Sequence, residues 1–354
     1  MPALLPEILT TRHGPLGRLT LNRPRALHSL SHAMCQSLAD TLLEWRDDLQ
    51  VQAVILDHAP GTRGFCAGGD VVAVRQSALM DGGVAGRAFF MAEYRLNHLL
   101  HTYPKPVIAC MDGVTMGGGV GLALPCRIRV ATENTQLAMP EGAIGLFPDV
   151  GAGHYLSRLP GQLGKFLALT AARLDGAECL WAGLATHYLA SDDLDEAKQA
   201  IAREPQAAGE ILSDLSTAPP PARLERNAAR IDRLFAPATL EGILAALKAD
   251  DSEWAAKELK AVASKCPTSA KVALRQIATA PPDFAAEMAR EYALAARLTA
   301  RHDFSEGVRA VLVDKDNAPR WQPSSPEGVT EAMLDEIFAP LPATEAWTPF
   351  SAAL

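Results

Sequence analysis

Two features that mark particular classes of protein are missing from this sequence of 354 residues. Its apolar runs are all shorter than the stretch of about 20 residues that crosses a bilayer as a helix. It also lacks a surplus of basic residues, because 33 Lys and Arg stand against 41 Asp and Glu, a formal net charge of −8. Without that surplus a chain cannot neutralise many phosphates. We therefore expect neither a membrane protein nor a general nucleic-acid binder.

Paired cysteines and targeting segments are missing as well. The six cysteines are scattered without a CxxC pair and lie mostly in apolar segments, which is typical of reduced, buried thiols. The scattered histidines show no spacing suited to metal ligands. The start, MPALLPEILTTRHG, has neither a secretory apolar core nor an Arg- and Ser-rich transit pattern. The sequence therefore predicts a cytoplasmic protein that needs no metal.

What is present is enough apolar sequence, 48% of all residues, for a sizeable core. Leu19 and Leu21 alternate with polar residues, as in a strand. Ser31 is a plausible N-cap for a helix with apolar residues at helical spacing, and the apolar strand Val54–Leu56 follows it. This β-helix-β order predicts an α/β fold.

Beyond the proline-rich linker at residues 216–221, apolar residues recur at helical spacing almost without strands. We therefore expect an α/β domain over residues 1–203 and a helical module over residues 204–354. The tail beyond Trp321 contains several prolines and is expected to be irregular.

The most informative stretch is a strand that runs into three glycines. Val107–Met111 has the length of a strand, and Gly117–Gly119 introduce a short apolar helix. The N–H groups at the start of such a helix can bind an oxyanion, although a tight turn needing positive φ explains the glycines equally well. Phe65–Asp70 follows another strand, and its Gly69 could supply a second donor. Gly69 and Gly118 could then converge on one carbonyl oxygen.

Three acids lie in apolar surroundings. Glu93 is on the apolar face of the helix expected over residues 88–101, where an ion pair with an arginine or a place at the edge of that face would explain it without a function. Glu141 and Asp149 lie eight residues apart, and Asp149 could simply cap the next helix. Carboxyl groups in dry surroundings have raised pKa values or specific partners, which favours catalysis. His154 and His187 lack a nucleophile at useful spacing and are expected to be structural.

Four segments together resemble the crotonase (enoyl-CoA hydratase/isomerase) superfamily and, within it, the 3-hydroxyisobutyryl-CoA hydrolase family. They are FCAGGDV, DGVTMGGGVGLAL, MPEGAIGLFPDVGAGHYLSRL and RHDFSEGVRA. The resemblance extends from about Ile8 to Phe338. It implies a ββα spiral core with a C-terminal helical module, an acyl-CoA substrate and no cofactor beyond the coenzyme A of that substrate. It is also compatible with a homo-oligomer.

The resemblance also implies roles for single residues. Gly69 and Gly118 would form the oxyanion hole, and the neighbouring Gly68 and Asp70 would bind substrate. Glu141 would act as nucleophile or general base on the thioester, and two further acids would complete the pocket. Of these, Asp149 would hold a 3-hydroxyl group and Glu93 would line the pocket.

The expected reaction is hydrolysis of a short 3-hydroxyacyl-CoA, such as 3-hydroxyisobutyryl-CoA in valine catabolism. Enoyl-CoA hydratases carry a second catalytic glutamate where this chain has Gly121, which disfavours hydration. Two alternatives remain: a hydratase or isomerase of the same fold, and a non-catalytic acyl-CoA-binding subunit.

Overall fold

A computed structural model describes residues 6–351, which divide into two compact units. The first unit comprises the described residues up to Gly69, Arg95–Leu137 and Arg173–Glu225. The second comprises Asp70–Tyr94, Ala138–Ala172 and the described residues from Arg226 onward. Each unit is thus built from three segments of the chain. The predicted boundary at residue 203, which separates an α/β part from a helical part, stays a prediction.

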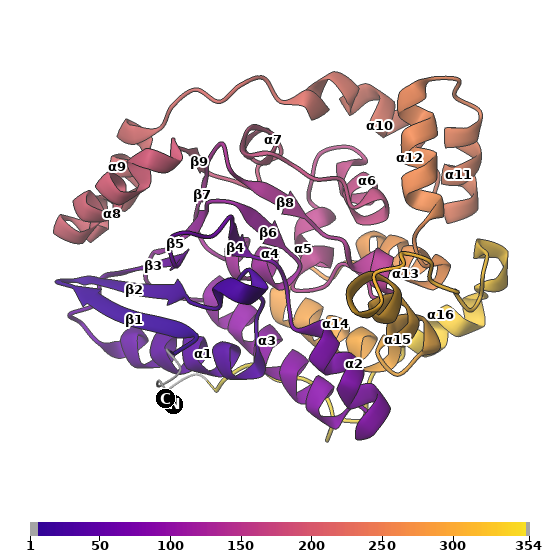
Figure 1. Cartoon of the computed structure of the whole chain (residues 1–354), viewed down its shortest axis with the longest axis horizontal. Coiled ribbons are helices and arrows are strands. Elements are labelled where there is room, and N and C mark those ends of the chain that lie inside the picture. Colours follow the sequence, from indigo (N-terminus) through magenta and orange to yellow (C-terminus); the bar gives the residue numbers. More distant parts are fainter. Residues whose placement is uncertain (1–5, 352–354) are drawn as a thin grey trace. The chain divides into compact units, whose positions relative to one another are not determined.

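Nine strands are found in the described residues, and they form two sheets (Figure 1). The six-stranded sheet has the order β1-β2-β3-β5-β7-β9, and the three-stranded sheet has the order β4-β6-β8. Only β1 and β2 pair antiparallel in the larger sheet, and its other neighbours are parallel. The strands are β1 (Ile8–His13), β2 (Leu16–Leu21), β3 (Ala53–His58), β4 (Gly64–Cys66), β5 (Val107–Met111), β6 (Val114–Met116), β7 (Ile128–Ala131), β8 (Gln136–Ala138) and β9 (His187–Tyr188). This confirms the predicted α/β class.

The first ββα repeat shows how local sequence produces the first unit. Helix α1 (His32–Asp47) begins where the Ser31 hydroxyl accepts the N–H of Met34 at 3.2 Å, as predicted. Its apolar side, including Leu38 and Trp45, is buried, and the chain then enters β3 parallel to β2. Helix α1 therefore supplies the crossover that a parallel strand pair requires.

Further helices complete the first unit. They are the end of α3 (Val84–His101), α4 (Gly118–Ala123), α7 (Gly176–Trp181), α8 (Leu194–Arg203) and α9 (Ala208–Leu215). The apolar sides of α8 and α9 share a core with Ile55 and Ile108 of the large sheet. Asp175 and Glu178 form a capping box at the start of α7.

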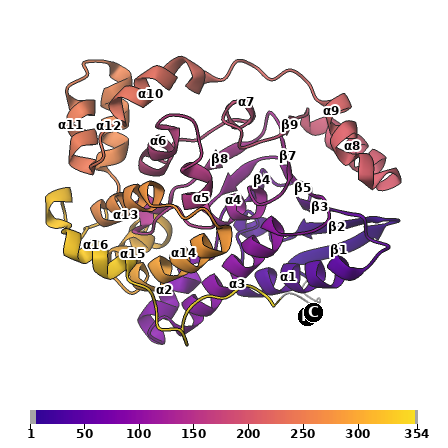
Figure 2. The ribbon, with the colours of Figure 1, turned by 180° about the vertical axis from the view of Figure 1, so that it is seen from behind.

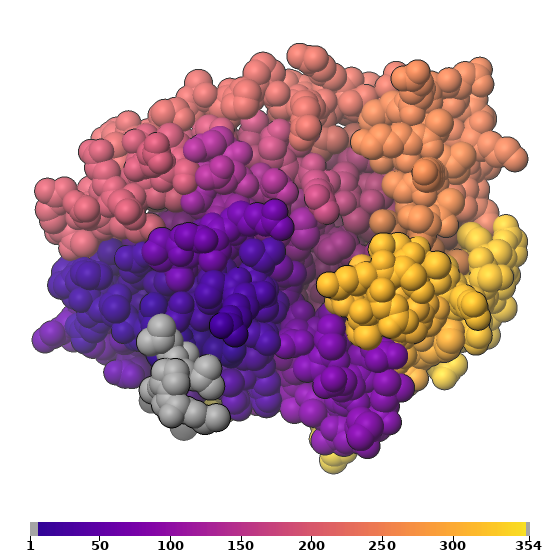
Figure 3. All heavy atoms as spheres, in the orientation of Figure 1, coloured from indigo at the N-terminus to yellow at the C-terminus, as the bar shows by residue number. Residues whose placement is uncertain are grey.

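The second unit is built almost entirely of helices, shown from behind in Figure 2. They are α2 (Val71–Met80), the start of α3, α5 (Ala152–Leu156), α6 (Leu163–Thr170), α10 (Ala228–Leu234), α11 (Leu240–Lys248), α12 (Glu253–Ala263), α13 (Pro267–Ala278), α14 (Phe284–Leu298), α15 (His302–Val308) and α16 (Glu331–Phe338). Figure 3 shows the orange atoms of α11 and α12 packed into one continuous surface. A π-helical turn at Arg309–Val313 follows α15, and a 3₁₀ helix, η2, spans Glu141–Ile144. The predicted helical character of the C-terminal part is confirmed.

One expectation about the C-terminal part was wrong. The tail beyond Trp321 contains the helix α16, whose N-cap Thr330 accepts the N–H of Met333 at 3.2 Å. Leu334 and Ile337 are buried on its inner side. Pro340 follows directly after the C-cap of this helix, and Pro326 begins a separate 3₁₀ helix before it. In the chain from residue 6 to residue 351, no helix combines the length and the apolar character needed to span a bilayer.

Candidate active site

Two glycine loops lie side by side in the first unit because the strands before them are neighbours. Strands β4 and β6 are parallel, so the loops that follow them leave the sheet at the same edge. The first loop carries Gly68 and Gly69, and the second carries Gly117 and Gly118. A Cβ atom on Gly68 would lie 3.5 Å from the oxygen of Met116 and 3.9 Å from the nitrogen of Gly118. The structure therefore brings the two predicted donor loops together.

The second loop ends in the first turn of α4. Gly117 has φ 48° and ψ −120°, and its oxygen accepts the N–H groups of Val120 and Gly121 at 2.8 and 3.1 Å. The N–H groups of Gly118 and Gly119 precede this ladder, so they have no acceptor within the helix. A Cβ atom on Gly119 would clash with the oxygen of Cys66 and lie 2.9 Å from its Cβ. Glycine at position 119 is thus required by the close approach of the two loops.

A cavity of about 620 Å³ adjoins both loops in the first unit. Its lining includes Ala67 and Met116, which adjoin the two loops in sequence, as well as Leu27 and Thr62. Two arginines, Arg63 and Arg173, also contribute to its wall. A volume of this size is typical of small-molecule sites.

The three predicted acids come together in the second unit. Glu93 on α3, Glu141 at the start of η2 and Asp149 before α5 are only 2%, 4% and 4% exposed. Burial raises the pKa of Asp149 from 3.8 to about 6 and is the main reason why the pKa values of Glu93 and Glu141 are well above 4.5. The charge of Asp149 raises the pKa of both glutamates further. Such a group can hold and exchange protons near neutral pH.

The partners of these acids differ. The Tyr94 hydroxyl donates to Oδ2 of Asp149 at 2.6 Å, which partly offsets the rise in the pKa of that carboxyl group. Oε1 of Glu93 and Oε2 of Glu141 have no hydrogen-bond partner in the described part of the chain. Among residues 6–351 no ion pair joins Glu93 to an arginine, and its side chain is only 2% exposed, so it does not lie at the edge of the apolar face. Neither alternative considered for Glu93 is realised. One oxygen atom of each glutamate is therefore left without a partner in the described residues.

The C-terminal helices fix the position of Glu141. The oxygen of Gly142 accepts the N–H of Cys266 at 2.9 Å, at the start of α13. Gly307 on α15 lies so close to η2 that a Cβ atom there would be 2.6 Å from Cα of Ile144. Gly145, with φ 73°, lies against the backbone of Asp303. The segment RHDFSEGVRA thus packs directly on the turn that carries Glu141.

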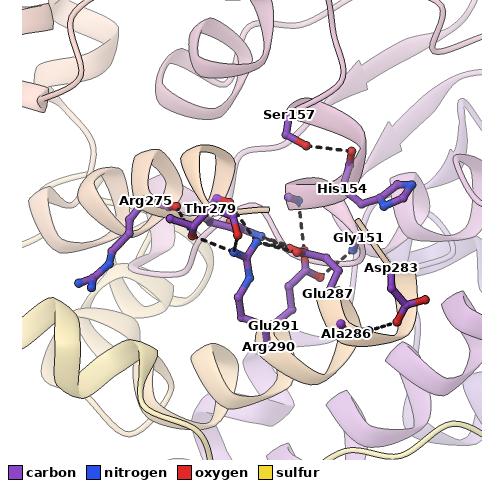
Figure 4. A network of polar contacts seen from close by, with 12 residues as sticks. Gly151, His154, Ser157, Arg275, Thr279, Asp283, Ala286, Glu287, Arg290 and Glu291 are labelled. Atoms are coloured by element: carbon purple, nitrogen blue, oxygen red, sulfur yellow. Dashed lines mark hydrogen bonds and ion pairs between the residues drawn. The ribbon is translucent and has the colours of Figure 1, made fainter. Parts of the chain in front are cut away.

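The backbone beside Asp149 is strained. Val150 has φ 53°, a left-handed conformation that costs a β-branched residue about 1–3 kcal/mol. The next turn, α5, begins after Gly151 without a side-chain cap, so Asp149 does not use its carboxylate as the helix cap considered above. Instead the carboxylate of Glu291, on α14, accepts the N–H groups of Gly151 and Gly153 (Figure 4).

Sequence reasoning missed Tyr94 and Glu291. A pattern for Glu291 was available, because Glu287 and Glu291 fall at helical spacing among the apolar residues Phe284, Met288 and Leu298 of α14. Two acids on an apolar face indicate specific partners. No comparable pattern distinguishes Tyr94 from any other buried tyrosine.

The remaining predicted residues have structural contacts. Asp70 is the N-cap of α2 and accepts the N–H of Ala73 at 3.2 Å. His154 lies edge-on to Tyr155 and Phe284, with ring centroids 5.2 Å apart in each case. The substrate-binding role of Asp70 stays a prediction, as do the roles assigned to the glycines and the other acids.

We expect Asp149→Asn to stabilise the protein at neutral and alkaline pH. An unfolded chain ionises this carboxyl group near pH 3.8, whereas the folded chain does so only at about pH 6. The folded state therefore loses stability as the pH rises from about 4 to 6 and does not regain it above that range. Removing the charge should raise the free energy of unfolding by on the order of 2 kcal/mol at pH 8 and have little effect at pH 4.

Denaturant unfolding at the two pH values measures this difference. Asp214→Asn, at an exposed position on α9, serves as the matched control and should change stability at neither pH. A difference between Asp149→Asn and wild type that is the same at pH 4 and pH 8 would contradict the assignment of the shifted pKa to Asp149.

Comparison with known proteins places these features in a family. A family model described as Enoyl-CoA hydratase/isomerase matches residues 16–338. The mitochondrial 3-hydroxyisobutyryl-CoA hydrolase of Gallus gallus is 40% identical over 349 residues, which cover 95% of this chain and 89% of the relative. The protein of the same name from Homo sapiens is 38% identical over 345 residues, covering 95% and 89%.

Two crystal structures match nearly the whole chain under other names. A carnitinyl-CoA dehydratase from Mycobacterium thermoresistibile has a TM-score of 0.90 and 39% identity, covering 96% of this chain and 98% of its own. An enoyl-CoA hydratase from Rhodobacter sphaeroides 2.4.1 has a TM-score of 0.90 and 37% identity, covering 97% and 100%. These matches confirm the predicted crotonase-like fold. The chain belongs to the enoyl-CoA hydratase/isomerase (crotonase) family.

Proposed function

We propose that this protein hydrolyses a short 3-hydroxyacyl-CoA thioester, with 3-hydroxyisobutyryl-CoA as the leading candidate. The products are coenzyme A and a 3-hydroxy acid, which for this substrate belongs to valine catabolism. The 3-hydroxyisobutyryl-CoA hydrolases that resemble the chain over 95% of its length support this activity. The observation that carries the proposal is the buried group of Glu93, Glu141 and Asp149, whose pKa values are all raised.

In this proposal the N–H groups of Gly69 and Gly118 bind the thioester oxygen. Negative charge develops on that oxygen when the carbonyl carbon becomes tetrahedral, so donors fixed in place before the reaction stabilise the transition state more than the substrate. The contact between their two loops within the first unit supports this role. The cavity that adjoins these loops would receive part of the acyl-CoA.

Glu141 supplies the carboxylate that acts on the carbonyl carbon. As a nucleophile it forms an anhydride with the acyl group while the carbon–sulfur bond breaks, and water then cleaves the anhydride. As a general base it takes a proton from water, whose oxygen adds to the carbon, and returns the proton to the departing sulfur. Both routes consume one water and yield the same acid and free thiol. Burial raises the pKa of Glu141, which makes its ionised carboxylate a stronger base and nucleophile.

Asp149 holds the 3-hydroxyl group of the substrate, and Glu93 lines the acyl pocket. Tyr94 donates to one oxygen of Asp149 at 2.6 Å, which leaves the other oxygen to accept a hydroxyl proton. A buried acceptor of this kind penalises an acyl group that lacks the hydroxyl, because the acceptor would then be left unpaired. Selectivity for a 3-hydroxyacyl chain follows from this arrangement.

The second candidate function is hydration of an enoyl-CoA, which the names of the two matching crystal structures favour. The purified protein should be given 3-hydroxyisobutyryl-CoA with a thiol reagent and, separately, crotonyl-CoA with absorbance detection. We expect thiol release at a rate well above background and no loss of enoyl absorbance. Loss of enoyl absorbance without thiol release would assign the protein to the hydratases. Binding of both compounds without any product would indicate an acyl-CoA-binding subunit.

The proposal includes no cofactor besides the coenzyme A of the substrate, and it is compatible with a homo-oligomer. It also places the protein in the cytoplasm. The six cysteines are free and buried, which suits a reducing compartment. Several relatives are mitochondrial by name, so cell fractionation is the appropriate test of location.

A further inference from the structure

We propose that Glu291 is a positioning residue for Asp149. Its carboxylate, on α14, holds the left-handed turn at Val150 and Gly151 and so fixes the direction in which the Asp149 carboxylate points. The part of this inference that concerns substrate rests on the proposed function, in which Asp149 binds the 3-hydroxyl group.

Two hydrogen bonds join Glu291 to the chain just after Asp149. Oε2 accepts the N–H of Gly151 at 2.7 Å and Oε1 accepts the N–H of Gly153 at 3.2 Å (Figure 4). The first contact spans 140 residues of sequence. Because the N–H groups at the start of α5 have no acceptor inside the helix, an external acceptor is needed, and a carboxylate is favourable at that end. Glu291 supplies it from another helix.

The turn that Glu291 holds contains a residue for which its backbone conformation is unfavourable. Val150 and Gly151 have φ values of 53° and 92°, and only the second is suited to a left-handed backbone. A Cβ atom on Gly151 would lie 2.7 Å from the ring of Phe284, and one on Gly153 would clash with the carboxylate of Glu287. Helix α14 therefore packs tightly against this turn. The position of α14 decides the position of the turn.

Glu291 is itself held and has no free oxygen for a substrate. Nε2 of Gln276 donates to its Oε1 at 2.8 Å and to Oε1 of Glu287 at 3.3 Å. Arg290 pairs with Glu287 at 2.6 Å, so the second acid of the pair has its own cation. Glu291 is fully buried, and three N–H donors occupy its two oxygens. This arrangement suits an anchor and not a group that reacts.

Asp149 is thereby fixed from two sides. Tyr94 fixes the carboxylate through the 2.6 Å hydrogen bond, and Glu291 fixes the backbone through the residues that follow. Loss of the second anchor allows the strained residue Val150 to relax to negative φ, which turns Asp149 relative to Tyr94. Loss of Glu291 should therefore lower activity mainly toward substrates that carry a 3-hydroxyl group, because Asp149 would bind that group.

The test is Glu291→Gln, assayed for kcat and KM with 3-hydroxyisobutyryl-CoA and with isobutyryl-CoA, which lacks the hydroxyl. The amide keeps the shape of the carboxylate but places an NH₂ group against one of the three donors. We expect kcat/KM for the hydroxylated substrate to fall about tenfold or more, and that for isobutyryl-CoA to change less than about threefold. An equal fall for both substrates, or no fall for either, would overturn the inference.

Amide hydrogen exchange gives a readout that does not depend on activity. We expect the N–H groups of Gly151 and Gly153 to exchange faster in Glu291→Gln than in wild type, and unchanged protection would also overturn the inference. If wild type hydrolyses neither substrate, the proposed function fails while the exchange data still decide whether Glu291 is the anchor.

Two further variants complete the design. Glu258→Gln changes another buried glutamate of the second unit, on α12, and should leave both activities and the exchange rates unchanged.

If Glu291→Gln does not fold, Gln276→Leu takes its place, because it removes one donor to Glu291 and leaves Glu287 and Glu291 unchanged. It should lower the preference for the hydroxylated substrate in the same direction, and an unaltered preference together with unaltered exchange would count against the anchor.

Discussion

Replacing Glu141 by glutamine is expected to lower kcat for hydrolysis of 3-hydroxyisobutyryl-CoA by about 1000-fold or more, with little change in KM. Glutamine has the shape of glutamate but cannot take a proton from water or form an anhydride with an acyl group. The proposed oxyanion donors, Gly69 and Gly118, are unchanged, so substrate should still bind. Steady-state kinetics with a thiol reagent provide the measurement.

The same substitution should make the protein more stable near neutral pH. Burial raises the pKa of Glu141, which means that the ionised side chain opposes folding, and the neutral amide removes that cost. Glu258→Gln is again a suitable control, since it should alter neither kcat nor KM. A Glu141→Gln protein with kcat within about threefold of wild type would show that another group acts on the thioester.

Gly119→Ala should cause the second large loss, with kcat/KM falling about 100-fold or more. The added Cβ atom would clash with the backbone oxygen of Cys66, so the loop of Gly68 and Gly69 has to separate from the start of α4. The N–H groups of Gly69 and Gly118, which we propose as donors, could then no longer bind one oxygen atom. Because the clash is with backbone, no side-chain rotation can relieve it, and the melting temperature should fall as well.

Gly209→Ala is the matched control for this substitution. Gly209 lies on α9 of the same unit, and an added Cβ atom there would have nothing within 4 Å. Alanine also favours the helix by up to about 1 kcal/mol relative to glycine. Activity should be unchanged and stability equal or slightly higher. Full activity in Gly119→Ala would contradict the paired-loop arrangement as the source of catalysis.

Features that depend on a few neighbouring residues could be predicted from the sequence. Ser31 caps α1, and Asp175 with Glu178 forms a capping box, because both contacts are made within three residues along the chain. The buried face of α1 follows from helical spacing alone. Apolar periodicity likewise predicted that the C-terminal part is helical.

Features that join distant segments could not be found in this way. The contact between Glu291 and Gly151 spans 140 residues, and the contact between Tyr94 and Asp149 spans 55. Local sequence also left two explanations for Asp149, and only the fold excludes the helix cap by placing its carboxylate against the Tyr94 hydroxyl. For Glu93 the sequence allowed an arginine partner, and burial beside two other acids emerges only from the folded chain.

The glycine loops could be predicted from the sequence only in part. A strand followed by glycines indicates a helix start after β6, but it does not indicate that β4 is the neighbouring strand. That pairing places Gly68 against Gly118. The residues alone raised the convergence of the two loops as one explanation beside a tight turn, and the resemblance to crotonases then implied it. The requirement for glycine at position 119 comes from the oxygen of Cys66, which no local pattern reveals.

The most direct test is to incubate the protein with 3-hydroxyisobutyryl-CoA in water labelled with oxygen-18 and to locate the label by mass spectrometry. We expect free coenzyme A and a 3-hydroxy acid that carries the label in its carboxyl group, because water is added to the thioester carbon. Label at the 3-hydroxyl position of an intact thioester would mean reversible dehydration, and it would contradict hydrolysis as the activity of this site.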